Sequence, residues 1–244
     1  TGVFLIAIVG ITATLISTSF LIFLSFLFLV KLKPKPASVD KGVVRTGESV
    51  KEGLRFVYKT KELLSSLSLD LFAVLFGGAV ALIPIYARDI LKVGSEGFGI
   101  LNGASDLGSI LIVIILTIFP AKKNQGKKLL LAVGGFGICI IVFGISKIFL
   151  LSFIALMISG MLDGISVVVR GTITQLKTPD HMRGRVMSVN SMFVNSSNEL
   201  GQFESGVMAK LMGTVPSVIF GGSMTLLVVI FTWFKSPTLR KMQY

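Results

Sequence analysis

The chain has 244 residues, of which 52% are hydrophobic and 15% charged, and its mean hydropathy is +0.85. A soluble domain has about 25% charged residues, so this composition excludes most soluble enzymes. The net charge is +12, but the basic residues lie in short breaks between apolar runs rather than in one patch. We therefore expect no nucleic acid among its partners.

Seven apolar runs follow one another along the chain, each near the length of a membrane-spanning helix. A bilayer core about 30 Å thick requires roughly 20 apolar residues in a helix. The runs cover residues 2–30, 67–87, 97–119, 129–145, 148–172, 184–211 and 217–234. This pattern predicts an all-α, multi-pass membrane protein with membrane lipids around it.

A basic linker separates the first run from the other six. Residues 31–66 contain Pro, Gly and many charges, which is typical of an exposed connector. Residues 48–60 within it predict an amphipathic helix, on the membrane surface or beneath the bundle. The later runs are joined by short turns, which favour antiparallel neighbours. The expected parts are a transmembrane helix over 1–30, the linker over 31–66, a six-helix bundle over 67–235 and a tail over 236–244.

Lys and Arg concentrate in alternate breaks, namely the linker, residues 120–128, residues 177–185 and the tail. Loops rich in basic residues stay in the cytoplasm, so we expect a cytoplasmic C-terminus. The chain starts at Thr1 and soon enters an apolar run without a basic segment before it. This beginning does not resemble a signal peptide, and we expect the chain to be the later part of a longer protein.

Polar residues recur at helical spacing in four of the six later runs, whereas residues 129–145 and 217–234 contain no acidic or basic residue. The polar residues are Asp70; Asn102, Asp106 and Ser109; Ser159, Asp163, Ser166 and Arg170; and Ser191, Asn195, Asn198, Glu199, Gln202, Glu204 and Ser205. An ionised group in hydrocarbon costs at least about 2.5–3.5 kcal/mol. We therefore expect these four helices to line a shared aqueous cavity, with the other two as scaffold.

The charged residues of these runs have more than one interpretation. Asp106 and Glu199 have no cation three or four residues away, and a carboxylate in a low-dielectric cavity binds a proton more readily. Asp163 and Arg170 can form a structural pair or a gate, and Asp70 is interpreted as an interfacial cap. The full expected set for substrate or proton binding is Asp106, Glu199, Glu204, Asn102, Asn195, Asn198 and Gln202.

Several chemistries have no counterpart in the sequence. The only His, His181, is in a loop, and there is neither a Cys/His cluster nor a phosphate-binding Gly-rich motif. No nucleophile–base pair is discernible. We expect no enzyme activity, no metal and no cofactor, and an ion gradient as the energy source.

Three stretches resemble the C-terminal half of a major facilitator superfamily transporter, and within it the enterobactin-exporter-like branch. They are LSLDLFAVLFGGAVALIPIYARDIL (67–91), DGISVVVRGTITQLKTPDHMRGRVMSVNS (163–191) and SNELGQFESG (197–206). The resemblance implies two six-helix halves, with residues 2–30 as the sixth helix and the bundle as helices seven to twelve. It also implies that helices seven, eight, ten and eleven line the cavity.

In that superfamily, charged residues latch the cytoplasmic gate between helices ten and eleven. The resemblance carries this role onto Asp180, Arg183 and Arg185, and we expect Asp163 and Arg170 to take part in gating. Residues 120–128, PAKKNQGKK, occupy the place of an acidic and basic gating motif but lack its Asp. The usual acid–base latch is therefore in doubt there.

The residues and the resemblance together lead to one main expectation. It is a secondary transporter in the bacterial cytoplasmic membrane, which exports a siderophore-like or drug-like small molecule by proton-coupled alternating access. It would require the missing N-terminal half of the same protein. The alternative is a non-transporting membrane scaffold or assembly factor on the same fold, whereas a channel is disfavoured because no repeated filter segment is visible.

Overall fold

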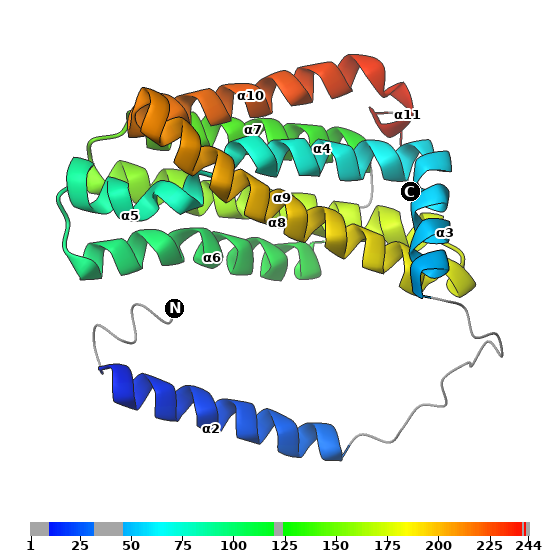
Figure 1. The fold of residues 1–244 in the computed structure, drawn as a ribbon, viewed down its shortest axis with the longest axis horizontal. Coiled ribbons are helices and arrows are strands. Elements are labelled where there is room, and N and C mark those ends of the chain that lie inside the picture. Colours follow the sequence, from blue (N-terminus) through cyan, green and yellow to red (C-terminus); the bar gives the residue numbers. More distant parts are fainter. Residues whose placement is uncertain (1–9, 32–45, 120–123, 241, 243–244) are drawn as a thin grey trace.

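The computed structural model describes residues 10–31, 46–119, 124–240 and 242, and within these ranges it is helical and contains no strand (Figure 1). The all-α expectation is confirmed. The helices are α2 (Ile11–Val30), α3 (Thr46–Lys59), α4 (Lys61–Gly77), α5 (Ile83–Ile85), α6 (Ser95–Ile118), α7 (Gln125–Ile145), α8 (Phe149–Lys177), α9 (Arg183–Met212), α10 (Thr214–Lys235) and α11 (Pro237–Arg240).

Six helical segments of the described ranges are long and apolar enough to cross a membrane: α2, Lys61–Ile90, α6, α7, α8 and α10. The expected span at residues 184–211 falls within α9, which has 30 residues. At a rise of about 1.5 Å per residue α9 is long enough to cross a bilayer. Its many polar residues make it too polar to count among the apolar, membrane-length helices.

The helices from α4 to α10 pack side by side in a bundle, whereas α2 lies apart from it (Figure 1). Helix α8 packs between α6 and α7, α10 packs on α7 and α4, and α9 packs on α4. Of the residues in α2, only Thr14 is buried. The bundle is therefore a single packed unit, to which α2 adds no core.

Glycines permit a close crossing of α6 and α8. A Cβ built on Gly108 would collide with the main-chain oxygen of Met157, and one on Gly160 with that of Ser105. The Ser109 hydroxyl donates a hydrogen bond of 2.9 Å to the Gly160 carbonyl. Small residues of this kind hold membrane helices together, because packing replaces the hydrophobic drive that lipid removes.

The segment Lys61–Ile90 is not one regular helix. Helix α4 ends at Gly77, and a 3-10 turn over Ala79–Leu82 and a π-helical turn over Tyr86–Ile90 flank the short α5. The Ser205 hydroxyl of α9 donates a hydrogen bond of 3.2 Å to the Gly78 carbonyl at this break. The same carbonyl also accepts the Ala81 N–H at 3.4 Å, so a neighbouring helix adds to the weak bonding of the interrupted backbone, as irregular backbone in a membrane requires.

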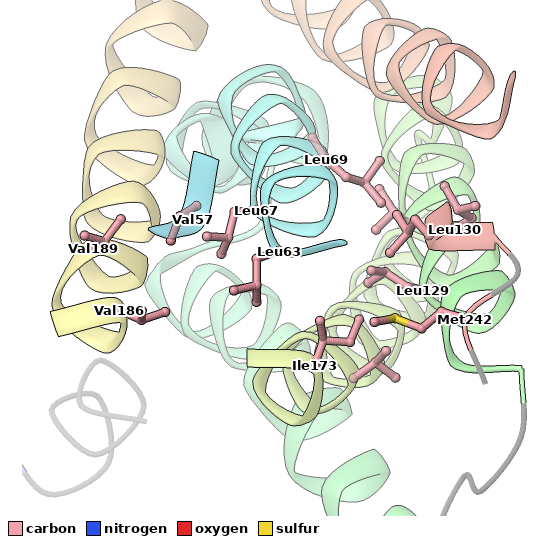
Figure 2. Close-up of a cluster of buried hydrophobic side chains, with 14 of the residues drawn as sticks. Val57, Leu63, Leu67, Leu69, Leu129, Leu130, Ile173, Val186, Val189 and Met242 are labelled. Atoms are coloured by element: carbon pink, nitrogen blue, oxygen red, sulfur yellow. The ribbon is translucent and has the colours of Figure 1, made fainter. Parts of the chain in front are cut away.

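One end of the bundle is closed by the linker helix and the C-terminal segment. Figure 2 shows side chains of α3, α4, α7, α8 and α9 meeting there with Met242 in one apolar cluster. Val57 of α3 is 2% exposed and Leu239 of α11 is fully buried. Helix α3 therefore packs beneath the bundle, the second of the two positions that the sequence leaves open.

Candidate functional site

The polar residues expected to bind substrate or protons lie mostly on the surface of the bundle. Asp106 is exposed near the middle of α6 and Asn102 is partly exposed one turn before it. On α9 the exposed members of the set are Asn195, Asn198, Glu199 and Gln202. Both α6 and α9 thus present exposed polar side chains near the middle of the helix.

Glu204 differs from the rest of this set because it points inward. It is partly buried, and its Oε1 atom is buried without a hydrogen-bond partner. The next residue, Ser205, contacts the break between α4 and α5 through its bond to Gly78. Glu204 is therefore next in sequence to the residue that contacts the interrupted helix.

Asp70 of α4 and Arg170 of α8 form an ion pair, and each residue is only 6% exposed. The interpretation of Asp70 as an interfacial cap is wrong, since the residue is buried within α4. A structural pair between Asp163 and Arg170 is not formed either. Those two residues are seven positions apart on one helix, about 10 Å along its axis, whereas the α4–α8 contact brings Asp70 to the guanidinium.

Asp163 is partly buried and has no partner among the described residues. None of the described residues forms an ion pair or hydrogen bond with its carboxylate. It lines a small cavity together with Asp70 and Ser166, and the Ser166 hydroxyl is also buried without a partner. Two carboxylates and one hydroxyl therefore meet between α4 and α8.

Ion pairs at the closed end of the bundle involve the residues expected to act in gating. Arg183 pairs with Asp180 at 2.7 Å on the surface. Arg185 of α9 donates a hydrogen bond of 2.6 Å to Glu52 of α3. Lys177 of α8 lies 3.4 Å from Glu62 of α4. The acidic partners Glu52 and Glu62 were missed in the sequence, because no local spacing links them to cations more than a hundred residues away.

Basic residues gather at this same end. It holds the first turns of α7 and α9 and the last turns of α8 and α10 (Figure 1). Their basic residues are Lys127, Lys128, Lys177, Arg183, Arg185 and Lys235. The antiparallel packing thus converts the alternation of charge along the sequence into a basic end and an opposite end with few cations.

No group of three or more His, Cys, Asp or Glu side chains in the described ranges is placed to hold a metal ion. The charged groups instead fall into four kinds. They are exposed carboxylates within membrane-length helices, a buried ion pair, a partly buried carboxylate without a partner among the described residues, and ion pairs at one end of the bundle. Groups of this kind within membrane helices mark ion and substrate pathways.

Comparison with known proteins identifies a family. A family model described as "Transmembrane secretion effector" matches residues 1–243. The uncharacterized MFS-type transporter YfmI of Bacillus subtilis (strain 168) is 24% identical over 240 residues, which are 94% of this chain and 58% of that protein. The chain thus spans little more than half the length of this relative, and no solved structure matches it. The chain belongs to the MFS-type transporter family.

Proposed function

We propose that the chain is part of a secondary active transporter that exports a small molecule of the siderophore or drug class from a bacterial cell. The observation that carries this proposal is the position of Asp106 and Glu199, exposed on the bundle but far from the ends of α6 and α9. A carboxylate at that depth cannot face hydrocarbon without a large cost. It is stable against a water-filled pathway.

A second bundle of the whole protein would form the other wall of this pathway. The relative YfmI is considerably longer than this chain, which leaves room for such a bundle. Helix α2 lies apart from the bundle described here. We would expect this of a helix that belongs to the second bundle. Two bundles that rock about a site between them alternately open it to each side of the membrane.

The basic end of the bundle would face the cytoplasm, because loops rich in Lys and Arg are retained there. The protein would lie in the cytoplasmic membrane, with its C-terminus inside the cell. The pairs Arg185–Glu52 and Lys177–Glu62 lie at this end and join α9 to α3 and α8 to α4. Breaking and forming such pairs would accompany opening of the cytoplasmic side, together with Arg183 and Asp180.

The proton gradient would drive this transport without a cofactor. Asp106, Glu199 and Glu204 are the carboxylates positioned to exchange protons with the pathway or to contact a cationic substrate. The polar side chains of Asn102, Asn195, Asn198 and Gln202 would provide hydrogen bonds to the substrate.

Accumulation of ethidium in bacteria that lack their own exporters tests this function. Cells expressing the full-length protein should retain less ethidium than control cells, and a protonophore should abolish the difference. The double variant Asp106→Asn, Glu199→Gln should lose the effect. The matched control is Glu96→Gln, which removes an acidic group from the first, exposed turn of α6 and should leave efflux unchanged.

Two results would contradict the proposal. If efflux by the double variant equals that of the wild type, the two carboxylates have no part in transport. If neither ethidium nor a panel of siderophores and macrolides is exported by a correctly inserted protein, the function is not export of this class, and a scaffold role gains support.

A further inference from the structure

A small cavity lies inside the bundle between α4, α7 and α8. Its volume is about 10 Å³, close to the space that a single water-sized sphere requires. Val74, Val133 and Phe136 form apolar walls, and its polar groups are Asp70, Asp163 and Ser166. The cavity is therefore a small, mostly apolar space with a few converging oxygens.

The charges around this cavity do not cancel. Asp70 is neutralised by its buried ion pair with Arg170. Asp163 has no such partner among the described residues. If both carboxylates were ionised, the group would have one negative charge in excess within the bundle interior. Such a charge is stable only when a cation or a proton compensates it.

Ser166 provides an independent indication of a bound group. The residue is 2% exposed, and its hydroxyl has no hydrogen-bond partner. It lies one helical turn after Asp163 on α8 and lines the same cavity, as side chains three positions apart share a helix face. Buried hydroxyls almost always have a partner, so an additional donor or acceptor in this cavity is expected.

We propose that Asp163 binds a proton in this cavity and that release of this proton is one step of the coupling, in addition to proton exchange at Asp106, Glu199 and Glu204. The second half of this inference rests on the proposed function, whereas proton binding itself does not. A protonated carboxyl removes the excess charge. Its hydroxyl can donate a hydrogen bond, and its other oxygen can accept one from Ser166, directly or through one water molecule.

A sodium ion fits the cavity less well than a proton. Coordination of sodium in transporters commonly uses main-chain carbonyls of unwound helices. The cavity-lining parts of α4, α7 and α8 are continuous α-helix, so their carbonyls are already bonded within the helices. Only two carboxylates and one hydroxyl remain, and the space is that of one water-sized sphere.

The helices packed against α8 bring one further charged group, Asp70, to the cavity. Helix α4 contributes Asp70. Helix α7 has Lys128, which lies in a groove with Leu162 on the flank of α8 and does not line the cavity. The carboxylates of α6 and α9 are not among the lining residues either. Among the described residues, Arg170 is thus the cation bonded to a carboxylate of this cavity, and that carboxylate is Asp70.

Proton binding would therefore control the contact between α4 and α8. While Asp163 is protonated, Arg170 remains with Asp70. When the proton leaves, the ionised Asp163 repels Asp70, which lines the same cavity, and the bond that ties α8 to α4 weakens. This repulsion couples one proton to a relative movement of two cavity-lining helices.

Infrared spectroscopy of the purified full-length protein tests the site without a substrate. The carbonyl stretch of a protonated carboxyl should be present near neutral pH, should disappear on alkalinisation, and should be absent in Asp163→Asn. The matched control Asp89→Asn, at an exposed residue that pairs with Arg88 on the surface, should retain it. A band that is unchanged in Asp163→Asn overturns the proposal, as does a band that sodium removes when it replaces potassium at constant pH.

A second variant keeps the test decisive if Asp163→Asn does not fold. Ser166→Ala should retain the carboxyl band but shift its frequency, because the hydrogen bond to the hydroxyl is lost, and an unshifted band would overturn the site. Export and proton binding can also fail separately. A normal band without ethidium export refutes the proposed function alone, whereas protonophore-sensitive export without the band refutes this inference alone.

Discussion

Arg185 at the start of α9 and Glu52 of the linker helix α3 are joined by a hydrogen bond of 2.6 Å, although 133 positions separate them. The linker helix is thereby attached to a helix whose polar face lies toward the proposed pathway. Partly exposed pairs of this type contribute about 0.2–1 kcal/mol. Most of the attachment must therefore come from close packing.

The packing of α3 against α9 depends on Gly53. A Cβ built there would lie 2.8 Å from the main-chain oxygen of Arg185, and such a contact requires backbone movement. We expect Gly53→Ala to loosen α3, although alanine favours a helix by about 1 kcal/mol over glycine. Hydrogen exchange of the α3 amides in the full-length protein should be faster in this variant.

Gly47 provides the matched control, because a Cβ built on it meets nothing within 4 Å. Gly47→Ala should leave exchange in α3 unchanged or slow it slightly. Equal exchange rates in the two variants would show that α3 is not held by this contact.

The buried pair between Asp70 and Arg170 should respond strongly to loss of one member. We expect Arg170→Met to destabilise the protein by about 3–5 kcal/mol, because Asp70 would remain buried without its counter-ion. The double variant Asp70→Asn, Arg170→Met should recover much of that loss, since removing both charges of a buried pair is often nearly neutral. Midpoints of thermal unfolding in detergent measure both effects.

Arg183→Met is the control for this pair, because Arg183 bonds Asp180 on the surface and its loss should cost less than about 1 kcal/mol. If the double variant is no more stable than Arg170→Met, the cost arises from lost packing rather than from an unpaired charge.

The crossing of α6 and α8 should tolerate no side chain at its centre. We expect Gly160→Val to prevent the close approach to Ser105, with a loss of stability above about 2 kcal/mol or failure to accumulate in the membrane. Gly103→Ala on α6 is the control, since its Cβ would meet nothing within 4 Å. Yield of monodisperse protein in detergent compares the two, and similar yields would argue against this crossing.

Helical periodicity was sufficient to predict the features that depend on the sequence of a single helix. The positions of the long helices, the polar stripe of α9 and the lack of charged residues over 129–145 of α7 and 217–234 of α10 all follow from residue spacing and bilayer thickness. The break after Gly77 was harder to foresee, because the contact of Ser205 with the Gly78 carbonyl comes from another helix.

Relations between helices could not be predicted in the same way. The partner of Arg170 is set by the approach of α4 to α8, so spacing within α8 could suggest only Asp163. The isolated position of Asp163 and the orphaned Ser166 hydroxyl became visible only once three helices were packed together. Burial of individual polar groups depends on those long-range contacts.

The proposed pathway predicts which surface residues meet water and which meet lipid. Asp106 and Glu199 are exposed on the bundle, but so are Leu131 of α7 and Phe231 of α10, at 68% and 62%. Exposure alone therefore does not separate a pathway from a lipid-facing surface. Lipid excludes both water and charged reagents, so chemical access provides the distinction.

Single cysteines can be introduced at these four positions after Cys139→Ser. Their rates of reaction with a membrane-impermeant maleimide can then be compared between positions, in both inverted and right-side-out vesicles. We expect cysteines at 106 and 199 to be labelled at least tenfold faster than those at 131 and 231, because a thiol reacts as thiolate and ionises poorly in hydrocarbon. Alternating access further predicts that conditions which favour the outward-facing state reduce labelling from the cytoplasmic side. Equal, slow labelling at all four positions would mean that Asp106 and Glu199 do not face water, and the pathway between two bundles would have to be abandoned.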